Sequence, residues 1–467
     1  MLCQEWDPNH KIRKDLETSF YIIANKKPFL GLFVYKIFSN MDIAKIHELF
    51  LKCTSVSIDT RKIQANSLFV AIKGENFDAN TFAKEALEKG AAYVIIDNSD
   101  FYIDHRTILV EDSLQALQEL AKFHRNYLKI PIIALTGSNG KTTTKELIYA
   151  VLSSKYKTKA TIGNLNNHIG VPLTLLSFTT ETEIGIVEMG ANHKKEIEFL
   201  CDLAQPDFGY ITNFGKAHLE GFGGVEGVIQ GKSEMYHFLS DNSKLAFVNL
   251  DDAIQVEKTR AINHYTFGVN KLEANVIISE VTANPFVTVT LQDLKIKSHL
   301  IGLYNANNLN AAIAIGDYFK IPYEQIKSAL EGYVPENNRS QLITKGTNQI
   351  ILDAYNANPS SMAVAIENFK QLDNSNKIAI LGDMFELGEE SFEEHKNIVD
   401  SLSNQNEIVC HFVGTDFFAN RFNAENFHFH ATYEDLAACI NEQKINQSTL
   451  LIKGSRGMAL ERTLDLF

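Results

Sequence analysis

A glycine-containing loop followed by a lysine and three threonines is the part of this sequence with the clearest chemical meaning. Residues 134–146 read ALTGSNGKTTTKE, a short apolar run that ends in a glycine turn before a helical pattern opens at Lys141 and Thr142. Backbone N–H groups at a helix N-terminus bind anions, the Lys141 ammonium adds a positive charge, and the Thr142 hydroxyl can hold Mg²⁺. The predicted nucleotide-binding residues are Gly137, Ser138, Asn139, Gly140, Lys141, Thr142 and Thr143.

This loop departs from the strict GxxxxGK[ST] pattern, because Leu135 occupies the first glycine position. The alternative interpretation is a helix that simply begins after a glycine turn. A strand before the loop and a helix after it favour nucleotide binding.

Short apolar runs must position this loop. They lie at residues 132–135, 184–188, 209–212 and 245–249, with helical segments between the earlier ones, which predicts a parallel sheet with right-handed crossovers. Glu188 ends one run at the sheet edge where the loop is expected, so its carboxylate could hold Mg²⁺. The alternative is a solvated glutamate at a strand end.

The pattern of elements predicts an α/β protein of three domains, in line with its 467 residues. Residues 1–40 are interpreted as an extension of unknown role, and residues 41–127 as a small α/β domain. A central phosphate-loop ATPase domain with a mostly parallel sheet is expected at 128–334, where residues 275–301 alternate as antiparallel strands do. A Rossmann-like domain without a GxGxxG loop is expected at 335–467, with strands at 350–353, 378–381, 408–413 and 449–452.

Composition excludes several classes of function. A net charge of −13 argues against a large nucleic-acid interface, which needs a basic face. The longest apolar runs are shorter than the roughly 18 residues of a membrane helix, so no membrane span is expected. Five widely spaced cysteines without a CxxC pair favour a reduced, cytoplasmic protein over a disulfide scaffold or a zinc site.

Several further motifs, taken in order, resemble the Mur ligase family. They are NLNNHIGVPLTLL (164–176), EMGANH (188–193), TNFGKAHLEGFGG (212–224), LYNANNLNAA (303–312) and DAYNANPSSM (353–362). Within that family, YNANP and LGDMFELGEES (381–391) resemble the member that adds D-alanyl-D-alanine. The sibling that adds diaminopimelate or lysine usually carries a histidine-containing DYAHxP segment, and that histidine is missing here.

This resemblance implies an ATP-dependent peptide ligase of cell-wall precursor synthesis. Its substrates would be UDP-N-acetylmuramoyl-tripeptide and D-alanyl-D-alanine, its cofactor Mg²⁺, and its intermediate an acyl phosphate. Such chemistry gathers anionic oxygens, so it needs cations more than a nucleophilic side chain. The resemblance places catalysis at Lys141, Glu188, His218 and Lys232. Metal ligands would be Thr142, Glu188, His218 and Lys232, the last as a carbamate.

The same resemblance assigns substrate contacts. Asn305, Arg339 and Asp353 would complete the ATP site, the last two from the third domain after it closes over ATP. The segments SIDTRK and AIKGENFDAN would bind UDP through Ser57, Asp59, Arg61, Lys73 and Gly74. The segment KGSRGMALE, after a strand, would bind the dipeptide through Lys453, Ser455 and Arg456. Ordinary loops and solvated charges remain the alternative for each.

Three hypotheses remain from the sequence. The first is the D-alanyl-D-alanine-adding ligase, acting in the cytoplasm and expected to be a monomer. The second is a sibling amide ligase that adds an amino acid to UDP-N-acetylmuramoyl-dipeptide or to folate. The third is a nucleotide-gated binding protein that hydrolyses ATP slowly as a switch.

Overall fold

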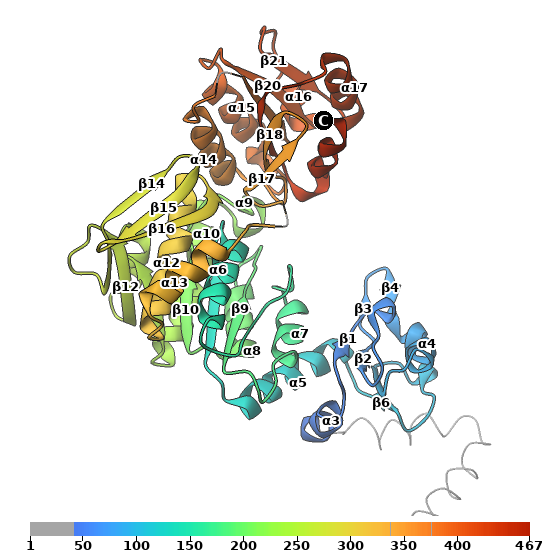
Figure 1. Ribbon diagram of the computed structural model, residues 1–467. Coiled ribbons are helices and arrows are strands. Elements are labelled where there is room, and N and C mark those ends of the chain that lie inside the picture. The colour runs from blue at the N-terminus through green and yellow to red at the C-terminus, as the bar shows by residue number, and fades with distance from the viewer. Residues whose placement is uncertain (1–41, 337, 375) are drawn as a thin grey trace, which may run out of the picture. The chain divides into compact units, whose positions relative to one another are not determined.

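The computed structural model describes residues 42–336, 338–374 and 376–467 (Figure 1). The chain forms two compact units that divide between Tyr127 and Leu128. The predicted extension at 1–40 lies outside the described residues, so its assignment as an extension of unknown role stays a prediction.

The first unit is a small sheet with helices. Its four strands are all parallel, in the order β1-β2-β5-β6, and Phe69, Val94 and Ile96 are buried in its core. The strands are β1 (Val56–Ser57), β2 (Leu68–Val70), β5 (Tyr93–Ile96) and β6 (Thr107–Leu109), with a hairpin of β3 (Lys73–Gly74) and β4 (Phe77–Asp78). The helices are α3 (Ile43–Phe50), α4 (Ala83–Glu88) and α5 (Ser113–Leu128), with 3₁₀ turns η1 (Thr60–Lys62), η2 (Ala79–Phe82) and η3 (Ser99–Phe101).

The second unit contains a seven-stranded sheet in the order β13-β12-β11-β10-β7-β9-β8, in which every pairing is parallel. Apolar runs such as Ile132–Thr136 are buried along their whole length, because helices cover both faces of a parallel sheet. The strands are β7 (Ile132–Thr136), β8 (Thr158–Ala160), β9 (Ile184–Glu188), β10 (Phe208–Ile211), β11 (Leu245–Asn249), β12 (Asn263–Val269) and β13 (Val276–Ile278).

Helices and a small antiparallel sheet accompany these strands. The helices are α6 (Lys141–Ser153), α7 (Gly170–Leu176), α8 (Glu196–Ala204), α9 (Leu219–Phe222), α10 (Val225–Asp241), α11 (Ala253–Lys258), α12 (Ala306–Tyr318) and α13 (Tyr323–Gly332), with the turn η4 (Leu303–Asn305). The antiparallel sheet is β14 (Glu280–Ala283), β15 (Phe286–Leu291) and β16 (Leu294–Ile301). The expectation of antiparallel strands over 275–301 was therefore wrong at its start, because β13 pairs in parallel with β12.

A six-stranded sheet follows in the order β17-β18-β22-β19-β20-β21, parallel except for the β17–β18 hairpin. Its strands are β17 (Gln341–Lys345), β18 (Asn348–Asp353), β19 (Lys377–Gly382), β20 (Ile408–Val413), β21 (Phe427–His430) and β22 (Thr449–Lys453). Its helices are α14 (Pro359–Lys370), α15 (Ser391–Leu402), α16 (Thr415–Ala419) and α17 (Tyr433–Gln443), with turns η5 (Gly388–Glu390), η6 (Arg456–Met458) and η7 (Leu460–Leu466). The α/β class with mostly parallel sheets is confirmed.

The cysteines of the described chain, Cys53, Cys201, Cys410 and Cys439, are all free thiols. Within residues 42–336, 338–374 and 376–467, none of the helices combines the length and apolar character needed to cross a bilayer.

Candidate functional site

The carboxyl ends of three neighbouring strands create the site. In the register of the central sheet, Leu135 of β7 lies opposite Glu188 of β9, and Thr136 lies opposite Ile211 of β10. The phosphate loop leaves β7 at this edge, which brings it beside Glu188 and the segment that follows β10. Ligands bind at such edges in open α/β sheets.

The glycines of the phosphate loop are required by its backbone. Gly137 has φ +140° and Gly140, the residue before α6, has φ +78°, both in the region that favours glycine. A Cβ on Gly137 would lie 2.0 Å from the Thr212 hydroxyl oxygen, and a Cβ on Gly140 would lie 2.7 Å from Asn308 Oδ1. Neither space admits a side chain.

Residues that follow β10 support the phosphate loop through hydrogen bonds. Thr212 Oγ1 and Asn213 Nδ2 both donate to the Asn139 carbonyl, at 2.6 and 2.9 Å. Ser138 N donates to Asn213 O at 3.1 Å, and the Ser138 hydroxyl donates to the Gly215 carbonyl at 2.6 Å. Thr212 and Asn213 were not among the predicted site residues. The TNFG motif contained them, but the sequence did not reveal that they support the loop.

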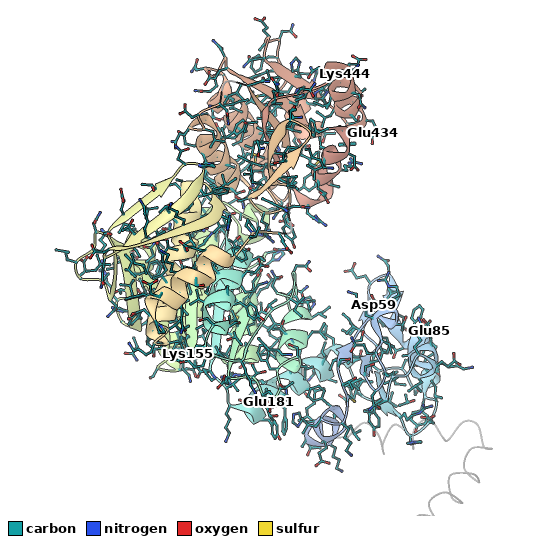
Figure 2. All side chains as sticks on the ribbon, in the orientation of Figure 1. Asp59, Glu85, Lys155, Glu181, Glu434 and Lys444 are labelled. Carbon is teal, nitrogen blue, oxygen red and sulfur yellow. The ribbon has the colours of Figure 1, made fainter. Side chains whose placement is uncertain are left out.

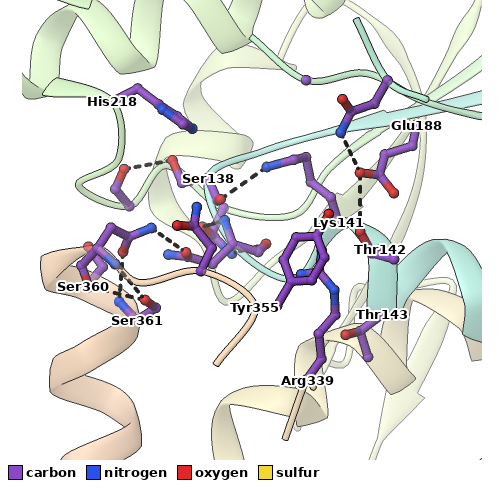
Figure 3. Close-up of a pocket in the computed structure, with 18 of the residues that line it drawn as sticks. Ser138, Lys141, Thr142, Thr143, Glu188, His218, Arg339, Tyr355, Ser360 and Ser361 are labelled. Carbon is purple, nitrogen blue, oxygen red and sulfur yellow. Dashed lines mark hydrogen bonds between the residues drawn. The ribbon is translucent and has the colours of Figure 1, made fainter. Parts of the chain in front are cut away.

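Lys141 projects its ammonium into the loop (Figure 3). Its Nζ donates to the Gly137 carbonyl at 2.8 Å and to the Ser138 carbonyl at 3.1 Å. Burial lowers the pKa of Lys141 to about 8; the Glu188 carboxylate opposes this shift and the Arg339 charge adds to it. The two carbonyls bind the cation weakly, so anionic phosphate oxygens would bind it better.

Glu188 is a buried carboxylate with unused acceptor capacity. Its Oε1 accepts from the Thr142 hydroxyl at 3.2 Å and from Asn166 Nδ2 at 2.8 Å (Figure 3). Its Oε2 is buried without a hydrogen-bond partner, and Lys145 Nζ lies 3.7 Å away. A buried carboxylate oxygen without a donor, beside a threonine hydroxyl, offers the hard oxygen ligands that Mg²⁺ prefers. The residues present therefore fit a magnesium ion.

His218 and Lys232 have different partners in this structure. His218 Nδ1 is hydrogen-bonded to the Glu386 carboxylate. Lys232 is 1% exposed, and its Nζ donates to the Ala191 carbonyl at 3.0 Å and lies 4.8 Å from the centre of the Phe222 ring. Burial, with the charge of Lys141, holds the pKa of Lys232 well below its usual value, while Glu196 and Glu234 oppose the shift. An unmodified Lys232 ammonium would not fit a metal site, because it carries a positive charge.

The opposite wall is formed by side chains just before β17 and at the carboxyl ends of β18 and β22. The Arg339 guanidinium stacks 3.6 Å above the centre of the Tyr355 ring (Figure 3), and its Nε is buried without a hydrogen-bond partner. Asp353 accepts from Ser340 N at 3.1 Å and from Lys453 Nζ at 2.6 Å. Lys453 is the last residue of β22 rather than part of the loop beyond it, so its buried ammonium serves first to neutralise Asp353.

Asn305 and its neighbours close one end of the site. Asn305 is 3% exposed, and its Nδ2 donates to the Ile301 carbonyl at 2.7 Å. Its Oδ1 accepts from Asn308 Nδ2 at 2.8 Å, and Asn308 Oδ1 accepts from the Thr144 hydroxyl at 3.0 Å. This chain of bonds ties the asparagine-rich segment to α6.

These residues enclose one cavity of about 760 Å³. From the predicted site it is lined by Ser138, Asn139, Gly140, Lys141, Thr142, Thr143, Glu188, His218, Asn305, Arg339, Asp353 and Lys453. Gly137, Lys232, Ser455 and Arg456 are not among the described residues of its lining. Ser455 Oγ instead accepts from Phe385 N at 2.9 Å, and Arg456 pairs with Glu461 at 3.2 Å.

Contacts from the C-terminal sheet's helices and loops reach the residues around the phosphate loop. Asn358 Nδ2 donates to Asn139 Oδ1 at 2.7 Å, and the Ser360 hydroxyl accepts from Lys216 N at 2.7 Å. Lys216 Nζ also pairs with Glu394 at 2.6 Å. Asn358 caps α14, and Pro359 occupies its first turn, so the helix start is locally fixed while it touches the loop. The sequence analysis identified the DAYNANPSSM motif but did not predict these contacts.

The predicted UDP-binding residues all belong to the first unit. Asp59, labelled in Figure 2, accepts from Arg61 N at 3.0 Å and pairs with its guanidinium at 2.8 Å. The hydrogen bonds from Arg61 lower the pKa of Asp59 to about 2. Ser57 Oγ donates to the Asp59 carbonyl at 2.9 Å, and Lys73 and Gly74 form the exposed strand β3.

Gly137→Ala is expected to destabilise the protein and abolish ATP binding, because the new Cβ would lie against Thr212 in a backbone conformation that alanine resists. Gly346→Ala is the matched control: its φ is +57°, but no atom lies within 4 Å of the added Cβ, so it should lose only about 1–2 kcal/mol. Chemical unfolding and ATP titration measure both effects. Equal losses of stability in the two variants would contradict the steric argument.

The chain resembles known proteins over nearly its whole length. Residues 52–125, 135–316 and 338–456 match, respectively, the Mur ligase family catalytic domain, the Mur ligase middle domain and the Mur ligase glutamate ligase domain. The chain is 36% identical to the UDP-N-acetylmuramoyl-tripeptide–D-alanyl-D-alanine ligase of Bacillus subtilis (strain 168), covering 87% of this chain and 91% of that protein. Identity to the protein of that name from Escherichia coli (strain K12) is 33%, covering 88% and 92%.

Solved structures give the same result. MurF from Acinetobacter baumannii has a TM-score of 0.78 at 30% identity, covering 88% of this chain and 93% of that one. MurF ligase from Thermotoga maritima in complex with ADP has a TM-score of 0.77 at 26% identity, covering 90% and 97%. The resemblance seen in the motifs is confirmed, and the chain belongs to the Mur ligase family.

Proposed function

We propose that this protein is an ATP-dependent, ADP-forming ligase that adds D-alanyl-D-alanine to UDP-N-acetylmuramoyl-tripeptide in peptidoglycan precursor synthesis. One observation carries the proposal. The segment DAYNANPSSM, which distinguishes this member from its sibling, lines the same cavity as the phosphate loop through Tyr355, Asn358 and Ser361. The names of the relatives support the same substrate pair.

In the proposed reaction the carboxylate of the tripeptide attacks the γ-phosphate of ATP, which releases ADP and leaves an acyl phosphate. The amine of D-alanyl-D-alanine then attacks the activated carbonyl, and phosphate leaves as the peptide bond forms. The protein's part is to bind and orient anions. Lys141 neutralises charge on the β- and γ-phosphates, and Arg339, with its buried unpartnered Nε, reaches the γ-phosphate.

We propose that Thr142 and Glu188 hold Mg²⁺, which would supply positive charge beside the phosphates. Support comes from the buried Glu188 Oε2, which has no hydrogen-bond partner. Asn166, which was not among the predicted site residues, donates to the other carboxylate oxygen and orients the group. Magnesium titration of a Glu188→Gln variant should give at least tenfold weaker binding than the parent.

We propose that Lys232 is carbamylated and joins His218 at a second magnesium site. In this reaction the neutral amine attacks CO₂, forms an N–C bond and releases one proton, which leaves an anionic carbamate. The low pKa of Lys232 supports the proposal, because only the unprotonated amine is a nucleophile. The anion would also compensate for the neighbouring Lys141 charge, which contributes to the low pKa.

The remaining assignments concern substrates and domains. Asn305 would face adenine and Asp353 the ribose, while Lys453, Ser455 and Arg456 would contact the dipeptide. We assign UDP binding to residues 41–127, ATP binding to 128–334 and the closing Rossmann-like domain to 335–467. We propose that the protein acts in the cytoplasm, which suits its nucleotide substrates. We propose a monomer, which light scattering at assay concentration would check.

Phosphate release is expected to require ATP, UDP-N-acetylmuramoyl-tripeptide and D-alanyl-D-alanine together, because the acyl phosphate has no productive acceptor without the amine. The measurement is free phosphate with each substrate omitted in turn. Turnover driven by a free amino acid, with no effect of D-alanyl-D-alanine, would assign the protein to the sibling activity. Turnover with ATP alone would instead favour a nucleotide-driven switch.

A further inference from the structure

Three histidines and a cysteine gather on one face of the C-terminal sheet. His411 on β20 lies opposite His428 on the edge strand β21. His430 is two residues further along β21, so its side chain lies on the same face. Cys439 comes from α17, the helix between Glu434 and Lys444 in Figure 2. None of these four is among the described residues that line the nucleotide cavity.

Local packing explains why Cys439 meets the histidines. Leu436 and Ile440 of α17 are buried in the core of this sheet together with Val413 of β20. Cys439 is three residues after Leu436 and therefore shares the inward side of the helix. The helix start is fixed by a capping box of Thr432 and Asp435, which sets its register over the strands.

The potential ligand atoms are close enough for one metal ion. One ring nitrogen of His411, one of His430 and Cys439 Sγ all lie within 4.8 Å of one another. His411 Nδ1 and His430 Nε2 are 3.0 Å apart. Tetrahedral zinc with ordinary bond lengths needs about 3.3 Å between two nitrogens and about 3.6 Å between nitrogen and sulfur. The two nitrogens are therefore about 0.3 Å closer than a zinc ion would hold them.

Hydrogen bonding within the cluster is incomplete without an ion. His411 is fully buried and His430 is 7% exposed. The pair shares a single hydrogen bond, and His411 Nε2 is buried without any partner. Buried polar atoms in native proteins are nearly always paired, and His411 Nε2, the ring nitrogen that does not face His430, still lacks a polar partner.

One side-chain donor faces the sulfur of the cysteine. Gln443 Nε2 lies one turn further along α17 and donates to Cys439 Sγ at 3.4 Å. A donor to sulfur is the kind of outer contact that orients and stabilises a metal-bound thiolate. Two imidazoles and one thiolate suit Zn²⁺ and are a poor set for Mg²⁺, which takes oxygen ligands.

We propose that His411, His430 and Cys439 form a Zn²⁺ site separate from the ligase chemistry. The fourth position is left to water, and binding releases the Cys439 thiol proton. The ion ties α17 to the edge strand β21 and to β20. This site revises the expectation from cysteine spacing that the protein has no zinc site, because the ligands come from three elements that fold together. It does not depend on the identity of the ligase substrates.

Untagged full-length protein, stripped with a chelator, is expected to bind one equivalent of Zn²⁺ with a rise in Tm. Co²⁺ used in its place should give a thiolate-to-cobalt band in the near ultraviolet. An oxygen site such as Thr142 and Glu188 gives no such band, so this spectrum reports on a cysteine. Cys439→Ser should abolish the band, and His430→Gln should weaken Zn²⁺ binding at least tenfold.

Two matched controls keep the test specific. Cys53→Ser removes a free, half-buried thiol elsewhere, and His264→Gln removes an exposed histidine on β12. Both should retain the parent's band and Zn²⁺ stoichiometry. The proposal is overturned if the parent shows no thiolate-to-cobalt band, or if the band survives unchanged in Cys439→Ser. Circular dichroism verifies that these variants fold.

Discussion

Lys141→Ala is expected to lower ATP turnover by roughly 100- to 1000-fold, the usual cost of removing one group that stabilises charge in a transition state. The Lys141 ammonium lies within the loop that we propose binds the phosphates, and its contacts are the Gly137 and Ser138 carbonyls. Those carbonyls remain in the variant, so the fold of the loop should survive. The measurement is phosphate release at saturating substrates.

The same Lys141→Ala variant should bind the UDP-tripeptide within about twofold of the parent, because the predicted UDP-binding residues belong to the first compact unit. Lys159→Ala, an exposed lysine on β8, is the matched control and should leave both properties unchanged. Calorimetric titration measures each ligand separately. Loss of UDP-substrate affinity as large as the loss of ATP affinity, in a folded variant, would contradict the proposed division between the units.

Lys232→Arg is expected to be as inactive as Lys232→Ala, with turnover lowered at least about 1000-fold. Arginine keeps a positive charge and cannot form the carbamate. The alternative role, a buried cation that donates to the Ala191 carbonyl, would tolerate arginine better than alanine. Phosphate release under saturating substrates compares the three proteins, and near-native activity of Lys232→Arg would rule out the carbamate.

Two further readouts separate carbamate chemistry from poor packing of the larger arginine in this buried position. Acetate should partly restore Lys232→Ala, since a free carboxylate can replace the missing anion in the space that alanine leaves. Protein equilibrated with ¹³C-labelled CO₂ should give a carbamate resonance that both variants lack. Lys194→Arg is the matched control, because this exposed lysine donates to Gln230, which lies on α10 with Lys232, and should retain activity.

Much of the strand arrangement could be predicted because parallel strands buried on both faces are continuous apolar runs. Residues 184–188, 245–249 and 408–413 were predicted with the bounds that the structure has. Register was harder to predict. Strand β13 is only three residues long, and its parallel pairing with β12 depends on the path of the chain between them rather than on its own alternation.

The glycine loop before α6 could also be predicted from sequence order, because Gly137, Gly140, Lys141 and Thr142 are close neighbours along the chain. Glu188 was predicted to lie beside the loop for a similar reason, since the carboxyl ends of neighbouring parallel strands meet at one edge. Its unpartnered buried oxygen could not be predicted. The absence of a partner for Oε2 depends on the folded arrangement, in which Thr142 and Asn166 both donate to Oε1.

Long-range pairings were decided by packing alone. His218 bonds to Glu386 from 168 residues away, and Lys453 is drawn to Asp353 because their strands are parallel neighbours in register. A sequence lists such charges but does not say which of them will be desolvated together. His411 and Cys439 show the same principle. Neither stands out in its own segment, and only the packing of α17 against β20 and β21 brings the two side chains together.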